Sequence, residues 1–162
     1  MRSILTGLLS VTVLLLSSCS SSPQPSSAPK EQTAQKPAPP RPRDETQRFP
    51  MDGRVDTEVV GDHLMGKDFM PGGTLAHYKK GSKQYDMFVA RTASPDEAAM
   101  ILPDWRKALT GSKLVPSFGG YFGNDGERPV FVFSRGAWIA GIAGLPEKDA
   151  DLQARTLASR LN

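Results

Sequence analysis

The stretch Pro129–Gly144, with the sequence PVFVFSRGAWIAGIAG, contributes most to the predicted fold. Its four consecutive large apolar residues, Val130–Phe133, are typical of a central strand that is buried on both faces. Arg135-Gly136 interrupts the apolar run, and glycine tolerates the backbone conformation of a tight turn. We therefore expect two strands, Pro129–Ser134 and Ala137–Gly144, that pair as a hairpin.

A second hairpin is expected earlier in the chain, where Thr74–Lys80 and Gln84–Thr92 flank a short glycine-containing turn. Both segments contain the aromatic and β-branched residues that strands favour. Further strand structure is expected at Lys113–Phe118 and around Tyr121. Residues 50–73 are weakly patterned, and the sequence leaves open whether they form a loop or an additional edge strand.

Two helices are predicted from capping residues and apolar periodicity. The first begins at Ser94-Pro95-Asp96-Glu97, which offers a capping serine, a proline at the first helical position and a glutamate three residues after the cap. Its apolar stripe stays in phase across Pro103, so we expect one kinked helix rather than two. The second covers Pro146–Leu161, with apolar residues on one face and charged residues on the other.

These elements predict an α+β domain over residues 50–162, in the order β-β-α-β-β-β-α. We expect a mostly antiparallel sheet of about five strands, with both helices packed on one face. The length is that of a single domain. Although the whole chain has a formal net charge of +3, acidic and basic residues are equal in number within residues 50–162. A nucleic-acid-binding domain is therefore not expected.

The N-terminus has the pattern of an export signal. Arg2 precedes the apolar run Ile4–Leu16, which is too short for a membrane-spanning helix of about 20 residues and suits a secretory signal. The run leads into Leu16-Ser17-Ser18-Cys19, an aliphatic residue and two small residues followed by cysteine. This arrangement resembles the lipobox of bacterial lipoproteins.

The resemblance implies a processed, lipid-anchored protein. Residues 1–18 would be removed as a signal peptide, and Cys19 would receive a diacylglycerol and usually an additional acyl chain. Two or more chains give a stable membrane anchor. The position after the cysteine is Ser20 rather than the aspartate of the family's inner-membrane retention rule. The resemblance thus favours the outer membrane facing the periplasm, unless the host has a single membrane.

Residues 19–49 are expected to be a disordered tether, because they are rich in proline and serine and poor in apolar residues. Cys19 is the single cysteine of the chain, so the folded part is expected to contain no disulfide and no multi-cysteine zinc site. No cofactor is expected besides the covalent lipid. The domain itself also resembles small bacterial lipoprotein domains, through Gly119–Gly123 and a terminal helix, which implies no catalytic or binding residues.

The sequence contains few candidate catalytic residues, and none of them lies in a recognised catalytic motif. The two histidines, His63 and His77, have no recognised metal-ligand spacing, and a metal site needs three or four ligands. Ser117 or Ser134 could supply the serine of a triad, but no Gly-x-Ser-x-Gly motif is present. We therefore expect a protein that is not an enzyme.

The run Phe118–Gly123, with the sequence FGGYFG, is the most unusual feature of the folded part. Its glycines suit a bulge or bend in the sheet, with the aromatic rings packing inward. Alternatively, Tyr121 and Phe122 could project as a binding surface, because aromatic residues dominate binding hot spots. The same bend could bring Trp138 close to them, although a strand position favours the core for Trp138.

The leading interpretation is a lipid-anchored accessory or interaction module that holds a protein partner at the cell envelope. The alternative is a small-ligand-binding lipoprotein, with a pocket between the sheet and the helices near Tyr121, Phe122 and Trp138. A hydrolase that uses His63 or His77 is the least favoured of the three hypotheses.

Overall fold

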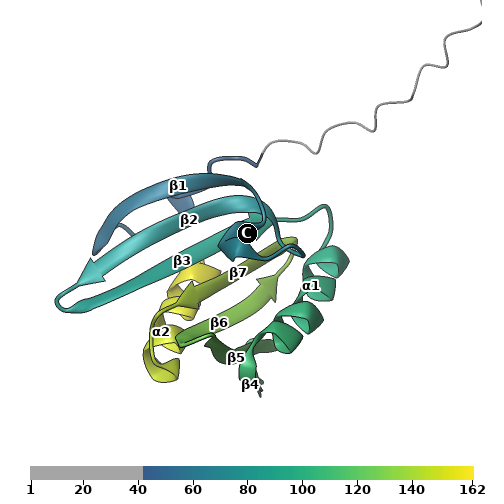
Figure 1. The fold of residues 1–162 in the computed structure, drawn as a ribbon. Helices are drawn as coiled ribbons and strands as arrows, with labels where there is room; N and C mark the ends of the chain where they lie inside the picture. The colour runs from purple at the N-terminus through teal and green to yellow at the C-terminus, as the bar shows by residue number, and fades with distance from the viewer. Residues whose placement is uncertain (1–41) are drawn as a thin grey trace, which may run out of the picture. The chain divides into compact units, whose positions relative to one another are not determined.

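The computed structural model describes residues 42–162, which form one seven-stranded sheet, two α-helices and two short 3-10 helices (Figure 1). The strands are β1 (Arg54–Asp62), β2 (Pro71–Lys80), β3 (Lys83–Arg91), β4 (Thr110–Val115), β5 (Gly120–Asp125), β6 (Arg128–Arg135) and β7 (Trp138–Ala143). The helices are α1 (Pro95–Ala108), α2 (Glu147–Ala158), η1 (Thr46–Arg48) and η2 (Leu64–Gly66).

The strands lie in the order β1-β2-β3-β7-β6-β5-β4, and every neighbouring pair is antiparallel. This confirms the α+β class and the two hairpins, β2–β3 and β6–β7. The expectation of about five strands is wrong. Residues 54–62 form the additional edge strand β1, and the region from Lys113 to Asp125 forms two strands joined by a turn. Three strands therefore precede α1 and four follow it.

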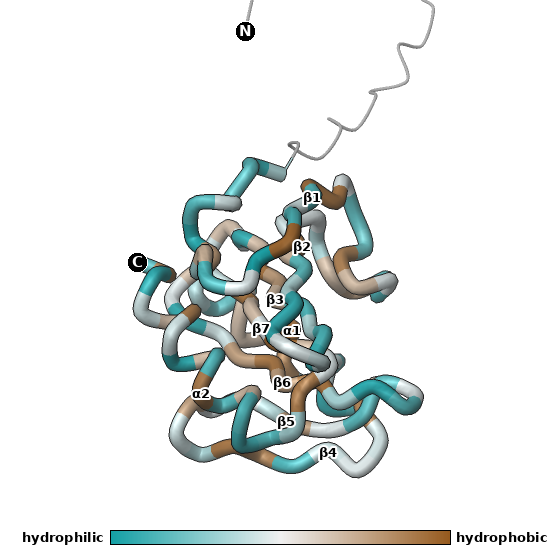
Figure 2. The backbone as a smooth tube through the Cα atoms, turned by 90° about the vertical axis from the view of Figure 1, so that its left-hand side faces the viewer, coloured by the Kyte–Doolittle hydropathy of each residue, from teal (hydrophilic) through white to brown (hydrophobic). Residues whose placement is uncertain are grey.

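The expectation that both helices pack on one face of the sheet is also wrong. Along β6, Phe131 and Phe133 belong to the core that contains the buried residues of α2, whereas Val130 and Val132 belong to the core that contains those of α1. Successive side chains of a strand point to opposite faces. The two helices therefore cover opposite faces of the sheet centre (Figure 1). Apolar segments lie along β6 and β7, in the middle of the sheet (Figure 2).

Helix α1 forms as its sequence predicts. The Ser94 hydroxyl accepts a hydrogen bond from the Glu97 backbone N–H at 3.1 Å, and the Glu97 carboxylate accepts one from the Ala93 N–H at 2.8 Å. These reciprocal bonds satisfy two backbone donors that a helix N-terminus leaves unpaired. The helix continues through Pro103 as a single element and buries Trp105 completely.

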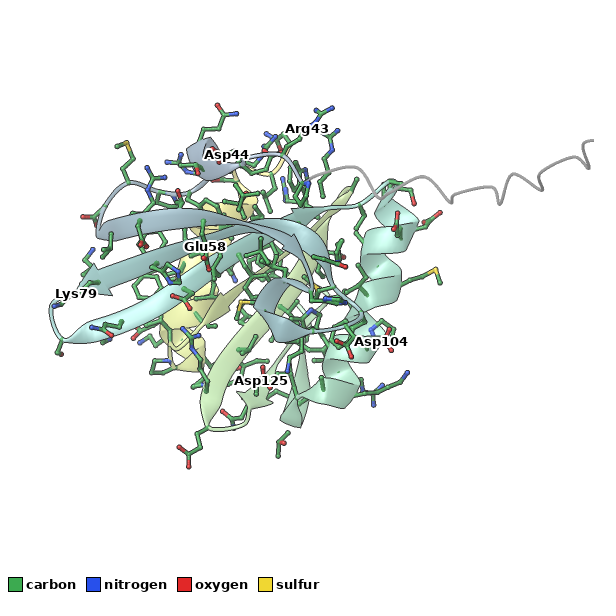
Figure 3. All side chains as sticks on the ribbon, turned by 45° about the horizontal axis from the view of Figure 1, so that its top comes forward. Arg43, Asp44, Glu58, Lys79, Asp104 and Asp125 are labelled. Carbon is green, nitrogen blue, oxygen red and sulfur yellow. The ribbon has the colours of Figure 1, made fainter. Side chains whose placement is uncertain are left out.

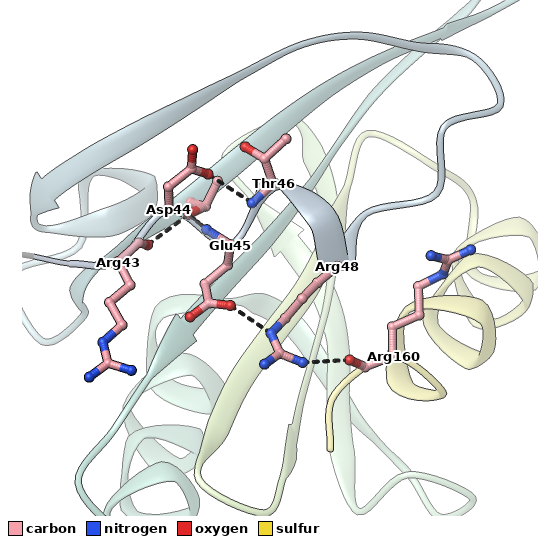
Figure 4. A network of polar contacts seen from close by, with 7 residues as sticks. Arg43, Asp44, Glu45, Thr46, Arg48 and Arg160 are labelled. Atoms are coloured by element: carbon pink, nitrogen blue, oxygen red, sulfur yellow. Dashed lines mark hydrogen bonds and ion pairs between the residues drawn. The ribbon is translucent and has the colours of Figure 1, made fainter.

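The boundary between tether and domain differs from the expectation, because residues 42–49 belong to the folded part. Phe49 is 1% exposed, and the Glu45 backbone N–H donates to the Thr74 hydroxyl at 3.0 Å. Arg48 bonds to the Glu45 carboxylate and to the Arg160 carbonyl, each at 2.7 Å (Figure 4). The polar sequence here is held by hydrogen bonds and one aromatic anchor. The signal peptide, Cys19 and the tether up to residue 41 lie outside the described residues.

Candidate functional site

The structure does not bring the three predicted surface aromatics together. Tyr121 and Phe122 are consecutive on β5, so they point to opposite faces, and both are half-buried. Tyr121 packs against the α1-side core and Phe122 against the α2-side core. Trp138 is only 4% exposed and belongs to the α2-side core. These residues do not form a common binding surface.

The glycines of the FGGYFG run allow close packing inside the sheet. A Cβ at Gly120 would lie 2.2 Å from the Val132 carbonyl oxygen, and one at Gly123 would lie 2.9 Å from the Leu109 Cβ. Real Cβ contacts are longer than this, so both positions require glycine. Phe118 packs against Phe131 at a ring-centroid distance of 5.3 Å. The inward-packing interpretation of this run is the one that the geometry supports.

The two histidines are also far from a catalytic arrangement. His63 is exposed and adopts a left-handed conformation, with φ of 53°. His77 Nδ1 lies 2.8 Å from the Asp86 carboxylate, and its Nε2 lies 3.7 Å from Glu58. Within residues 42–162, neither Ser117 nor Ser134 hydrogen-bonds to a histidine, and no group of three or more His, Cys, Asp or Glu could hold a metal ion.

The surroundings of His77 favour its protonated form. Burial opposes protonation, but the hydrogen bond that His77 donates to the Asp86 carboxylate and the negative charges of Asp86, Asp56 and Glu58 outweigh it and raise the pKa of His77. Asp86 also binds Arg128 at 2.6 Å. The result is a network of surface charges across β1, β2, β3 and β6. Glu58 lies on the outermost of these strands (Figure 3).

The most distinctive surface is the free edge at β1. In the described part of the chain, β1 pairs with β2 alone, so the backbone groups on its outer side have no strand partner. The strand is nine residues long, and none of its residues is buried. The opposite edge, β4, has six residues and a register shift between Thr110 and Lys113. β1 is thus the longer edge, and its own register shift, between Arg54 and Asp56, lies at the start of the strand.

Exposed aliphatic side chains gather at the same edge. Six large hydrophobic side chains are exposed in the described residues, and three of them lie in or just before β1: Met51, Val55 and Val59, with exposures of 78%, 66% and 47%. Thr57 and Val59 pair with Ala76 and Thr74, and so share the α2 side of the sheet. Asp56 and Glu58 pair with His77 and Leu75 and point to the other side. One side of the edge therefore presents the exposed Val59 beside Thr57, whose hydroxyl is hydrogen-bonded to that of Thr46 at 2.9 Å, and the other side presents two carboxylates.

A pocket of about 560 Å³ adjoins the end of β1. Its wall includes Gly61 and Asp62 of β1 and Pro71, Gly72 and Gly73 of β2. The remaining residues come from three other segments: Pro42, Arg43, Glu45, Val89, Arg91, Thr92, Ala93 and Glu97. The pocket is open and contains charges of both signs. It differs in place and character from the apolar pocket between sheet and helices that the ligand-binding hypothesis expects.

Sequence reasoning left residues 50–73 open as a loop or an edge strand, although a signal for β1 is present. Val55, Thr57 and Val59 alternate with Asp56 and Glu58, the period of two that marks a strand. The pattern is weak because a strand exposed on both faces buries little apolar surface.

Comparison with known proteins gave no match among family models, curated proteins or solved structures. Within residues 42–162, no helix has the length and apolar character needed to cross a bilayer.

Proposed function

We propose that this chain is a lipid-anchored protein of the bacterial cell envelope whose folded domain is a non-enzymatic interaction module. The anchor is argued from the sequence Leu16-Ser17-Ser18-Cys19. The observation that supports the interaction module is the free edge of β1, a nine-residue strand whose outer side has no strand partner in the described residues and which carries exposed aliphatic side chains.

The edge favours an extended segment of a partner protein. Added strands gain affinity from main-chain hydrogen bonds and specificity from alternating side chains. On this edge an added strand meets Thr57 and Val59 on one side and Asp56 and Glu58 on the other. The matching segment alternates apolar and basic residues. The carboxylates of Asp56 and Glu58 have a second effect: charged side chains on an edge strand discourage aggregation through that edge.

The anchor is tested by lipid labelling. Cells that express the wild-type chain or Cys19→Ser are grown with labelled palmitate, and the protein is recovered from membrane and soluble fractions. We expect label and membrane association for the wild type and loss of both for Cys19→Ser. Label that persists in the Cys19→Ser chain would contradict the anchor.

The interaction module is tested by cross-linking in intact cells followed by mass spectrometry. Val59→Lys and Glu58→Lys place a positive charge on each side of the edge, and Leu152→Lys makes the equivalent change at an aliphatic residue of α2 that is 62% exposed. We expect a reproducible envelope partner that is lost in both β1 variants and kept in Leu152→Lys. Loss in all three variants, or in none, would contradict β1 as the binding edge.

A further inference from the structure

Three arginines gather around Trp138 on the α2 side of the sheet, and a fourth, Arg43, lines a pocket beside one of them. Trp138, the first residue of β7, is directly opposite Arg91 of β3 and Arg135 of β6. Directly opposite residues of antiparallel strands project to the same face. The guanidinium carbons of Arg48 and Arg91 lie 4.3 Å and 5.5 Å from the Trp138 ring centroid. Arg43 lines the same pocket as Arg91, and we call these four residues the arginine face.

This face contains more positive charge than its own carboxylates neutralise. Arg48 forms an ion pair with Glu45 at 2.7 Å. Within residues 42–162, no carboxylate lies within ion-pair distance of Arg43, Arg91 or Arg135, and all three are exposed. Arg91 and Arg135 are two strand spacings apart, about 10 Å. Like charges at this separation repel weakly in water, and an anion bound beside them would remove that repulsion.

Three further carboxylates near the pocket keep their negative charge, and each accepts a backbone hydrogen bond. The Glu97 carboxylate accepts the Ala93 N–H at 2.8 Å as part of the α1 cap. Asp62 accepts the His63 N–H at 2.9 Å. Asp44, next to Arg43, accepts the Thr46 N–H at 2.9 Å (Figure 4). None of these carboxylates forms an ion pair with a residue of the arginine face.

The position of the face indicates the kind of anion. Pro42 and Arg43 both line the pocket, so the face adjoins the point at which the described chain begins (Figure 3). In a chain anchored at Cys19, the connection to the membrane enters the domain there. Guanidinium groups bind phosphate through two parallel hydrogen bonds. We infer that the arginine face binds the anionic phosphate headgroups of the membrane in which the protein is anchored.

The choice of a lipid surface rests on the proposed anchor, but the test does not use Cys19. The chain from Ser20 to Asn162, which contains every described residue, is sedimented with vesicles of phosphatidylcholine alone or mixed with phosphatidylglycerol. The Arg91→Gln/Arg135→Gln variant is compared with Lys79→Gln/Arg106→Gln, which removes the same charge from exposed residues outside the arginine face. Arg135→Gln alone serves if the loss of the Arg91–Trp138 contact disturbs folding.

We expect binding to the mixed vesicles that weakens as salt is added. Each arginine at an anionic surface strengthens binding about fivefold, so the Arg91/Arg135 variant should bind about 25-fold more weakly, and Arg135→Gln alone about fivefold. The control variant should stay within about threefold of the wild type, because distant exposed charges are screened. Equal loss in both double variants, or equal binding to both vesicle types, would overturn the proposal.

A soluble anion is separated from a lipid surface by adding inorganic phosphate or polyphosphate to the same chains. Binding of either compound without binding to mixed vesicles would overturn the assignment to headgroups. Failure of the vesicle test together with intact palmitate labelling would reject the arginine face and leave the anchor standing. Binding to mixed vesicles together with absent palmitate labelling would reject the anchor and leave the arginine face standing.

Discussion

At the scale of single residues, several glycines are required by the approach of neighbouring strands rather than by turns. Gly141 is the central case, because it lies in β7 between β3 and β6. A Cβ there would lie 2.4 Å from the Phe88 ring and 2.5 Å from the Phe131 carbonyl oxygen. Gly61, in β1, has no atom within 4 Å of its Cβ position. Substituting alanine at Gly141 and at Gly61 therefore compares the same change in a crowded and in an open position.

We predict that Gly141→Ala lowers the free energy of unfolding by about 1–3 kcal/mol, the usual cost of overpacking a filled core. Gly61→Ala should change it by less than about 0.5 kcal/mol, as surface substitutions do. Urea unfolding followed by circular dichroism measures both values. Similar effects of the two substitutions would show that β7 is packed more loosely than described.

His77 gives the domain a pH-dependent component of stability. Because its folded-state pKa is raised above the ordinary value of 6.5, protonation favours the folded state. This contribution is fully present below about pH 6.5 and is lost as pH rises through the folded-state pKa. We predict that His77→Gln destabilises the domain more at about pH 5 than at about pH 9. Urea unfolding at both values tests this, and an equal or larger effect at high pH would contradict it.

At the scale of elements, the local sequence signals of α1 are sufficient to predict where it begins. Ser94 accepts the Glu97 N–H, and the helix begins at Pro95 as the sequence predicts. We predict that Ser94→Ala lowers the free energy of unfolding by about 1 kcal/mol, the typical value of an N-cap. Ser117→Ala is the control, since Ser117 is exposed and has no side-chain hydrogen bond in the described residues. An unchanged stability for Ser94→Ala would contradict the role of the cap.

The elements that could be predicted are those whose signals are local. The hairpins β2–β3 and β6–β7 and both helices follow from turn residues, caps and periodicity. The side of the sheet on which each helix packs depends on tertiary contacts, although Val130–Phe133, apolar at every position, already required a cover on both faces. The sequence left strand β1 undecided, because a strand with no buried residue does not need the apolar alternation that would mark it.

The candidate site was harder to predict than the fold. Tyr121, Phe122 and Trp138 are chemically suited to binding, but their burial depends on neighbours that the sequence does not place. The arginine face combines η1 and the residues just before it with β3 and β6, which are separated along the chain and meet in the fold. The spacing of residues along the sequence cannot predict such a site, because its residues do not belong to a common motif.

At the scale of the whole molecule, the segment before β1 is part of the fold. The Phe49 ring lies in the α2-side core, although its sequence surroundings are those of a polar linker. We predict that Phe49→Ala lowers the free energy of unfolding by about 3–5 kcal/mol, as for other buried aromatic residues. Met51→Ala, at a residue that is 78% exposed, should have almost no effect. Equal stabilities for the two variants would place the start of the domain after residue 50.

The central claim is that an extended partner segment pairs with β1 in the cell envelope. Amide hydrogen exchange measures this most directly, by comparing the protein in isolated envelopes with the purified, partner-free chain. We predict slower exchange in the envelopes at amides of Arg54–Asp62, with unchanged exchange at the opposite edge, Thr110–Val115. Equal exchange of β1 in the two preparations, or equal slowing at both edges, would contradict the claim.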